Sequence, residues 1–414
     1  MTNPSQQTRA AWLLMLSAAA ILMITMGARQ SMGLFIAPIN QATGLGIVSI
    51  SFALAIGQFV WGAVQPVFGA IADKHGAGPV LVFGTFLLAA GLALTPFAHS
   101  QSALLATLGL LSAAGAGAGS FSILIGATAN QLPAERRSFA SGFINAGGSA
   151  GQFVFAPLAQ ALIHSFGWIA AMLTLAASSL LTLPLIAGLR RNPEVQNLAT
   201  VAGPVTPTTD SIKTLREQLS DALRNRSYIL LHLGFFTCGF HIAFLVTHLP
   251  GEVALCSLPA SVSATSLALI GLFNIAGSLT AGALGNRYRM KYVLGAMYAS
   301  RVIIIGLYLI SPRTALTFYL FAAGLGFSWL ATVPPTAGLV AKLFGTRYLG
   351  TLFGLTLLSH QIGGFFGAWL GGIAISRFGD YSWMWYADIV LAGLAALLCL
   401  PIREARLPRR VAMA

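Results

Sequence analysis

Long apolar segments follow one another along almost the whole chain, separated by short polar turns. An α-helix needs roughly 20 mostly apolar residues to cross the hydrocarbon core of a bilayer. Within each segment the residues are apolar on all sides and do not alternate with polar ones, as the strands of a membrane barrel do. The pattern therefore predicts an all-α polytopic membrane protein with twelve transmembrane helices. The expected spans are residues 11–38, 46–71, 79–97, 102–131, 139–163, 167–189, 227–250, 260–284, 291–310, 315–341, 350–375 and 382–401.

Composition and the positions of the charges support this interpretation. The 414 residues are 56% hydrophobic and 8% charged, with a mean hydropathy of +0.79, whereas soluble domains carry about 25% charged residues. If the N-terminus lies in the cytoplasm, all but four of the 23 Lys and Arg residues fall on the cytoplasmic side. This positive-inside bias accounts for the net charge of +13 without a nucleic-acid partner. We expect an integral protein of the bacterial inner membrane with both termini in the cytoplasm.

One long polar segment divides the chain. Residues 190–226 include the Pro- and Thr-rich stretch "VAGPVTPTTD", after which apolar residues from Ile212 to Leu223 recur at helical spacing. We expect a cytoplasmic loop with a short amphipathic helix. This loop would join an N-terminal six-helix half, residues 1–189, to a C-terminal six-helix half with its tail, residues 227–414.

A repeated loop sequence relates the two halves. "GAIADKHGAG" follows the second expected span, and "GALGNRYRMK" follows the eighth. The first copy resembles the loop signature of the major facilitator superfamily, whose glycine, acid, base and glycine correspond here to Gly69, Asp73, Lys74 and Gly76. The resemblance covers nearly the whole chain and implies the major facilitator fold, two pseudo-symmetric six-helix halves. It also implies a gating role for these four residues, in which Asp73 holds the end of a neighbouring helix. The second copy has Asn286 in place of the acid.

A second repeated pair places ionisable residues at the same depth in the first and seventh spans. "GARQSMGLFIAP" aligns with "GFHIAFLVTHLP", so that Arg29 corresponds to His241. An arginine at the bilayer centre costs about 2.5–3.5 kcal/mol on insertion scales, so water, an anion or a protein partner must offset it. Repeat-built transporters bind substrate near the midplane, where the repeats meet. We expect Arg29 and His241 to form one central substrate site. The alternatives are an arginine bonded to backbone carbonyls and a packed histidine.

Four further stretches narrow the resemblance to one branch of the superfamily. "RQSMGLFIAPI", "GFFTCGFHIAFLVTHLP", "LALIGLFNIAGSLTAG" and "LLSHQIGGFFGAWLGG" are similar to the monocarboxylate and oxalate–formate exchanger branch, which implies a carboxylate substrate. Members of that branch carry a basic residue in helix 8, where this chain has Asn274. Arg29 would therefore have to supply the fixed positive charge. Its planar fork of donors suits a carboxylate.

Other polar residues within the spans complete the expected substrate site. They are Gln30, Gln152, Asn274, His360 and Gln361. A hydrogen bond between helices is the alternative role for each of them. The stretch "SWLATVPP" indicates a broken tenth helix, whose freed carbonyls could line the cavity.

Three residues are candidates for carrying a proton: His241, His360 and Asp388. A histidine changes charge near neutral pH, and Asp388 is the only acid within any expected span. In the alternative, Asp388 pairs with Arg301, and each relieves the burial of the other.

The sequence contains no serine–histidine–acid set, no nucleotide-binding glycine loop and no metal-ligand cluster. We therefore expect no enzyme, no cofactor and no metal. The expected function is a secondary active transporter that moves a small organic anion, a mono- or dicarboxylate, by alternating access. Proton symport is the first expectation, the protein is expected to be a monomer, and its partners are the anion, protons and the lipid bilayer. Anion exchange, efflux of drugs or amphipathic metabolites, and substrate sensing without transport are the alternatives.

Overall fold

The computed structural model describes residues 4–189 and 214–404, and all regular structure in these ranges is helical. Ten helical segments within them are long and apolar enough to cross a membrane. The other two expected spans, 139–163 and 350–375, are also helical, but their glycine and polar residues make them less apolar. The central loop before Thr214 and the tail after Glu404 lie outside the described residues, and so do the expectations for them.

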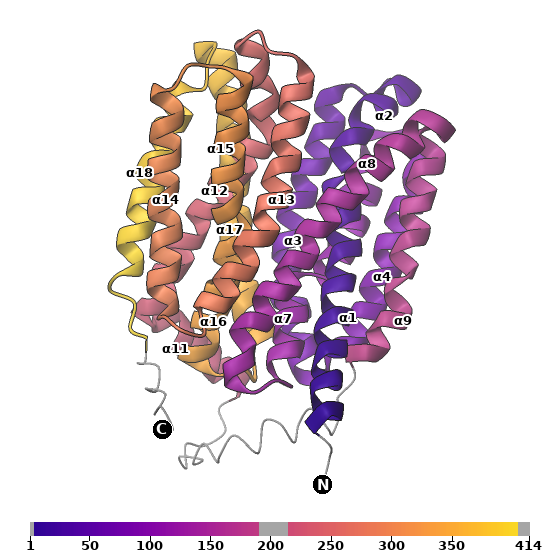
Figure 1. Cartoon of the computed structure of the whole chain (residues 1–414). Coiled ribbons are helices and arrows are strands. Elements are labelled where there is room, and N and C mark those ends of the chain that lie inside the picture. Colours follow the sequence, from indigo (N-terminus) through magenta and orange to yellow (C-terminus); the bar gives the residue numbers. More distant parts are fainter. Residues whose placement is uncertain (1–3, 190–213, 405–414) are drawn as a thin grey trace.

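The elements of residues 4–189 lie together on one side of the molecule, in indigo to magenta in Figure 1. In chain order they are α1 (Pro4–Gln30), η1 (Met32–Phe35), α2 (Ile36–Thr43), α3 (Ile47–His75), α4 (Ala77–Leu94), η2 (Thr95–Phe97), α5 (Gln101–Leu104), the π-helical η3 (Leu105–Ser112), α6 (Ala113–Ala118), α7 (Phe121–Ala129), α8 (Ala134–Leu180), α9 (Thr182–Ile186) and η4 (Ala187–Leu189). The long α8 reverses at Gly167, whose φ of 81° is a conformation that glycine adopts without a steric penalty. It therefore supplies the fifth span and the start of the sixth.

The elements after the central loop form the other side, in pink to yellow. They are α11 (Leu215–Arg224), α12 (Arg226–Leu255), α13 (Ala260–Leu284), α14 (Met290–Ile310), α15 (Ala315–Ser328), η5 (Leu330–Thr332), α16 (Val333–Phe344), α17 (Leu349–Phe378) and α18 (Ser382–Cys399). The short α11 begins with a capping box, in which Thr214 and Glu217 each bond the other's backbone N–H.

Both ends of the chain lie at the same end of the molecule, the lower end in Figure 1. We call this end the terminal face and the other end the far face. Helices α7, α11 and α16 lie towards the terminal face, and α2 lies at the far face.

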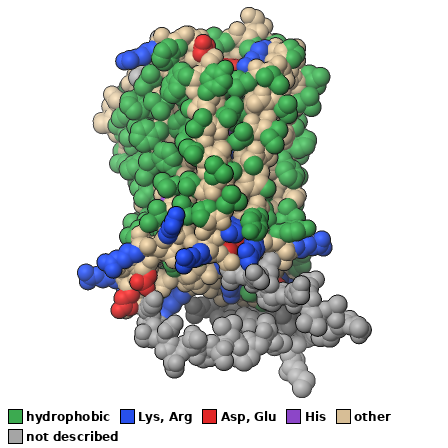
Figure 2. All heavy atoms as spheres, turned by 90° about the vertical axis from the view of Figure 1, so that its left-hand side faces the viewer, with side chains coloured by type: hydrophobic (Ala, Val, Ile, Leu, Met, Phe, Trp, Pro, Cys, Tyr) green, Lys and Arg blue, Asp and Glu red, His purple; other side chains and the backbone are tan. Residues whose placement is uncertain are grey.

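The outer surface between the two faces is apolar. Figure 2 shows a tall hydrophobic band over the side formed by α14 and α18, with Lys and Arg gathered below it towards the terminal face. Ile303, Ile310, Val390 and Leu397 are among the large apolar side chains exposed there. Exposed apolar surface of this extent is unfavourable in water but not in hydrocarbon. Because every helix satisfies its own backbone, the bundle suits a bilayer.

Several helix pairs join the two sides, among them α7 with α17 and α8 with α16, and two pairs make the most extensive contacts. α3 packs on α17, where a Cβ at Gly69 would overlap the backbone of Gly350, and α8 packs on α13, where a Cβ at Gly142 would overlap the backbone of Ser278 and Gly282. Side chains larger than hydrogen at these glycines would hold the backbones apart. These two contacts set the relative position of the halves in this state.

Candidate transport site

Arg29 lies at a break in the first span. α1 ends at Gln30, and the turn at Ser31 separates it from η1 and α2, so the single helix expected over residues 11–38 is discontinuous. A cation is favoured at this position because the carbonyl end of a helix carries partial negative charge. Broken helices with their ends at the substrate are a recurrent feature of transporter sites.

The guanidinium group of Arg29 is held by two residues of α3. Its Nη2 donates to Oε1 of Gln58, and its Cζ lies 4.3 Å from the centre of the Trp61 ring. Arg29 is half-buried and Gln58 is exposed. The ion pairs among the described residues join His241 to Asp388 and Lys342 to Glu404, so Arg29 has no carboxylate partner there. Its charge is therefore balanced by dipoles and a ring face and not by an acid.

The repeat partner of Arg29 has quite different surroundings. Nδ1 of His241 on α12 lies 2.6 Å from Oδ2 of Asp388 on α18, and the two side chains are 1% and 0% exposed. The His241 ring also contacts the Trp329 ring edge-on, with 6.0 Å between the centroids. The repeat thus gives the two residues equivalent positions along their helices, but His241 turns into the C-terminal half and away from solvent.

Arg301 satisfies the carbonyls at the break in the tenth span. Helix α15 ends at Ser328, and Nη2 of Arg301 donates to the carbonyl oxygens of Ser328 at 2.7 Å and Trp329 at 2.5 Å. The sequence hypothesis that Arg301 pairs with Asp388 is therefore not what the structure shows. The guanidinium group brings a charge-assisted donor to the carbonyls at this helix end, and the Trp329 carbonyl also accepts from Oγ1 of Thr332 at 3.5 Å.

A second break in the N-terminal half matches this one. α6 ends at Ala118, and the freed carbonyl of Gly119 accepts from Oγ1 of Thr25 on α1 at 2.9 Å. Cys238 on α12 lies correspondingly near the Trp329 carbonyl, at 3.9 Å from its Sγ. The internal repeat therefore extends from the sequence to the way each half bonds its broken helix.

Two asparagines tie the halves together at the break in the tenth span. Nδ2 of Asn145 on α8 donates to Oγ of Ser278 on α13 at 2.6 Å, and Nδ2 of Asn274 on α13 donates to Oγ of Ser149 on α8 at 2.6 Å. Both asparagines also bond the backbone of Leu330, whose carbonyl accepts from Asn145 at 2.8 Å and whose N–H donates to Asn274 at 2.9 Å. We call Asn145, Ser149, Asn274 and Ser278 the interdomain clamp.

Sequence reasoning had treated Asn274 as a substrate-site candidate and had not identified the clamp. The signal was present in "NAGGS" and "NIAGS", where an asparagine precedes a serine by four residues on two helices. Residues four apart share one helix face, so two such helices packed antiparallel can exchange bonds reciprocally.

The loop signature lies at the terminal face, at the end of α3. The Asp73 carboxylate accepts from the backbone N–H of Gly350 at 3.1 Å, from the N–H of Thr351 at 2.8 Å and from Oγ1 of Thr351 at 2.6 Å. These groups begin α17, whose N-terminus attracts a negative charge. Gly76 ends α3 with a φ of 88°, and Lys74 is exposed.

The remaining site candidates divide between the two halves. Gln361 is buried on α17, and its side chain fills the place that a Cβ at Gly62 of α3 would take. His360 faces the interior of the C-terminal half, with its ring centroid 4.9 Å from that of Phe235. Gln30 and Gln152 are half-buried on α1 and α8. Gln361 therefore lies between the two halves, against α3, the helix that also contacts Arg29. His360 lies inside the C-terminal half instead.

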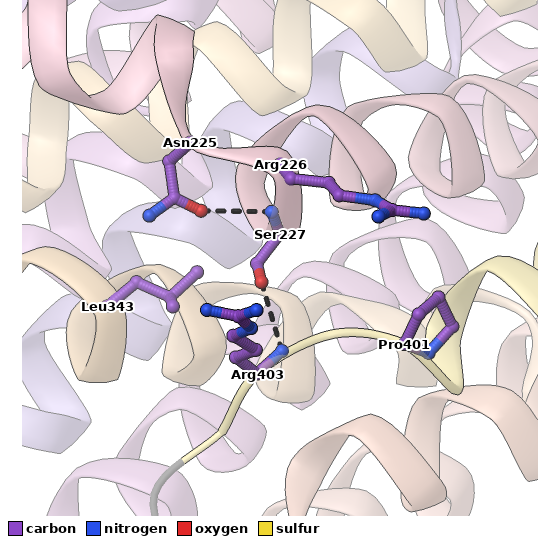
Figure 3. Close-up of a pocket in the computed structure, with 6 residues that line it drawn as sticks. All are labelled: Asn225, Arg226, Ser227, Leu343, Pro401 and Arg403. Carbon is purple, nitrogen blue, oxygen red and sulfur yellow. Dashed lines mark hydrogen bonds between the residues drawn. The ribbon is translucent and has the colours of Figure 1, made fainter.

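A pocket of about 460 Å³ opens at the terminal face (Figure 3). Its lining residues are Asn225, Arg226, Ser227, Leu343, Pro401 and Arg403. The N–H of Arg403 donates to Oγ of Ser227 at 2.9 Å, which ties the segment after α18 to the start of α12. The pocket contains no residue of the expected substrate site.

The fold and these polar groups define a class of protein, a polytopic membrane transporter that is not an enzyme. The sequence matches the Major Facilitator Superfamily over residues 18–368, and the chain belongs to that family. This result confirms the family and the all-α fold expected from the sequence.

Curated relatives share the full length of the chain. Monocarboxylate transporter 13 of Rattus norvegicus is 28% identical over 396 residues, covering 94% of this chain and 89% of the relative. The Oxalate:formate antiporter of Oxalobacter formigenes is 23% identical, covering 96% and 92%. Among solved structures, the proton:xylose symporter XylE superposes with a TM-score of 0.71 at 14% identity, covering 96% of this chain and 97% of that one. The structural likeness shows the fold alone.

Proposed function

We propose that the protein moves a small organic anion, a mono- or dicarboxylate, across the membrane by alternating access, with Arg29 as the anion-binding group. The observation that supports this is the state of Arg29, which is half-buried at the end of α1 without a carboxylate partner among the described residues. A bound carboxylate would accept two parallel hydrogen bonds from the guanidinium fork. Gln58 and Trp61 would hold the fork in place, and Gln30, Gln152 and Gln361 would add polar contacts. The names of the relatives cited above support this substrate class.

The described state fits one end of the transport cycle. Contacts between the halves extend from Asp73 and Thr351 at the terminal face to the interdomain clamp. We propose that the terminal face is cytoplasmic, as its basic residues suggest, and that this is the state closed to the cytoplasm. Asp73 is then the gating acid, and Gly69 and Gly76 allow the close approach and the turn that place it.

Coupling follows from the charge of the substrate. Moving one negative charge inwards against an inside-negative potential costs about 2.3 kcal/mol per 100 mV. Co-transport of one proton per charge removes this cost, and so does exchange for another anion. Proton symport is the function we propose first, and anion exchange is the second candidate, supported by the relative named as an antiporter.

The decisive experiment measures uptake by the purified protein in liposomes. Labelled formate, lactate and oxalate would be offered under an imposed pH gradient. We expect Arg29→Ala and Arg29→Lys to lower uptake at least tenfold, because a charge-assisted pair is worth about 1.5–3 kcal/mol and lysine lacks the planar fork. Arg377→Ala, which removes an exposed arginine at the end of α17, is the control and should transport normally.

Three outcomes would contradict the proposal. Normal uptake by both Arg29 variants would remove the anion site from this residue. Binding of a carboxylate without any flux in the wild-type protein would indicate a sensor, and flux of amphipathic drugs in place of carboxylates would indicate an efflux pump.

A further inference from the structure

The C-terminal half buries an ion pair that the anion site does not use. His241 and Asp388 contact each other across α12 and α18 and are essentially inaccessible to solvent. An isolated carboxylate in such a place would cost several kcal/mol of desolvation. Replacing a buried ion pair by apolar residues of similar volume is often neutral or stabilising, so packing alone does not account for this pair.

The carboxyl group of Asp388 is isolated from other acids. Helices α13, α14, α15 and α17 contain no Asp or Glu. The titratable groups that neighbouring elements bring to this interior include Arg301, Tyr298 and Tyr308 from α14, Cys238 from α12 and His360 from α17. Arg301 is committed to the carbonyls of Ser328 and Trp329. Asp388 therefore has His241 as its ionic partner, and the proton content of this pair sets the charge of the site.

We propose that His241 and Asp388 form the proton-binding site that couples transport, an inference that rests on the function proposed above. Nδ1 of His241 and Oδ2 of Asp388 are 2.6 Å apart, which is close enough for the two groups to exchange a proton. With that proton on either residue, the pair is neutral overall. Release of the proton leaves a neutral imidazole beside a carboxylate, a net charge of −1.

Titratable groups continue from the pair along one face of α12 towards the far face. His248 and Glu252 follow His241 by seven and eleven residues, which returns them to nearly the same side of the helix at heights of about 10 and 16 Å. His248 packs against the ring of Tyr381 with 5.3 Å between centroids, and Glu252 accepts from the hydroxyl of Tyr308 at 2.7 Å. Glu252 lies beyond residue 250, where the span expected from the sequence ends. This row of groups lies between the far face and the pair.

The pair also touches the element that closes the interface. The Trp329 ring contacts His241, and the next residue along the chain, Leu330, is bonded by both asparagines of the interdomain clamp. A change in the charge of His241 therefore acts on the segment Trp329–Leu330. This segment has one conformation in the closed interface and must adopt another when the clamp opens. Coupling between two sites requires such a shared two-state element.

The first test is independent of the substrate. Infrared difference spectra of purified protein in lipid, recorded as a function of pH, should show a titrating band of Asp388, either the carbonyl stretch of the protonated acid or a shift of its carboxylate stretch when the proton leaves His241. We expect the band to disappear in Asp388→Asn and to shift in His241→Gln, since the imidazole is its partner. A wild-type spectrum without a titrating band that depends on Asp388 would overturn the proposal.

The second test separates coupling from transport. We expect Asp388→Asn, and the double variant His241→Gln with Asp388→Asn that keeps a neutral hydrogen-bonding pair, to lose accumulation of formate or oxalate driven by a pH gradient. A gradient of about one pH unit drives about tenfold accumulation for one proton per charge. Exchange of labelled for unlabelled anion at equal pH should persist in both variants. Ser300→Ala, which removes a different hydrogen bond of the same half, from Oγ of Ser300 to the carbonyl of Met297 within α14, is the control and should accumulate normally.

The outcomes distinguish this inference from the proposed function. Full accumulation by Asp388→Asn would overturn the proton site and leave the anion site standing. Loss of exchange together with accumulation in the folded double variant would also overturn it, because a merely structural pair predicts that result. If no carboxylate moves in the wild type, the proposed function fails, and the infrared titration still decides whether the pair binds a proton.

Discussion

Two arginines within the membrane-spanning bundle show how one residue type can have different roles. Arg301 is fully buried and donates to two backbone carbonyls, whereas Arg29 is half-buried and meets an amide and a ring face. The first arrangement is complete without a ligand. The second leaves donors of a fixed cation available to an anion.

Replacing Arg301 should therefore lower stability whether or not substrate is present. Arg301→Met would remove the arginine donor from the Ser328 carbonyl and leave the Trp329 carbonyl only the longer contacts from Sγ of Cys238 and Oγ1 of Thr332. A buried carbonyl without a donor costs about 1–3 kcal/mol. We expect a lower melting temperature in detergent, measured with the exposed Arg287→Met as the control. An unchanged melting temperature would show that water or another side chain satisfies these carbonyls.

For single residues, the sequence predicted positions along the chain but not the directions in which the side chains point. The repeat aligned Arg29 with His241 in the sequence, and both stood out as ionisable residues within apolar spans. It could not tell which way each side chain turns, because that depends on neighbouring helices. Trp61 on α3 offers a ring to Arg29, and Asp388 on α18 offers a carboxylate to His241. Contacts such as these join residues far apart in the sequence and have no local signal.

Glycines set the spacing of the principal helix pair within each half. In the N-terminal half, Gly27 and Gly151 bring α1 against α8, and in the C-terminal half Gly239 and Gly363 bring α12 against α17. A Cβ at Gly239 would overlap the carbonyl of His360. Such close approach is the usual basis of helix association in membranes, where burial of apolar surface gives little.

A single methyl group at this contact should be costly. We expect Gly239→Ala to destabilise the protein by about 1–3 kcal/mol, the usual range for an overpacked core. Gly271→Ala is the matched control, since a Cβ there meets nothing within 4 Å, and alanine is the better helix former. Thermal unfolding of the two variants checks the prediction, and equal melting temperatures would refute it.

The halves as a whole are joined by a few directional contacts and not by a broad apolar seam alone. Asp73 bonds the start of α17 at the terminal face, and the interdomain clamp bonds α8 to α13 beside the break in the tenth span. Hydrogen bonds can be exchanged for water as the halves separate, which keeps the closed and open states close in free energy. The sequence predicted the fold and the gating motif at this scale. It did not predict the clamp, because one helix alone does not reveal its partner.

Weakening the clamp should open the terminal face at a distance. Asn145→Ala removes bonds to Ser278 and Leu330, a loss of about 1–2 kcal/mol to the closed state and roughly a five- to thirtyfold shift in its population. Hydrogen exchange at the N–H groups of Gly350 and Thr351, which Asp73 protects in this state, should accelerate. Asp73→Asn should have the same effect directly.

The exposed hydroxyl of Ser311 bonds only within its own helix turn, to the carbonyl of Leu307. Ser311→Ala is accordingly the control and should leave the exchange at the start of α17 unchanged. If Asn145→Ala also left that exchange unchanged, the clamp and the Asp73 contact would open independently.

The asparagines of the clamp bind Leu330 through its backbone alone. Any residue except proline, which lacks the N–H, presents the same two groups. The half-buried side chain at this position is therefore free to change without loosening the interface. Substitutions at Leu330 would therefore change the side chain beside the helix break and keep the hydrogen bonds that close the interface. Related chains could acquire new substrate preferences in this way without a change in the residues that open and close the halves.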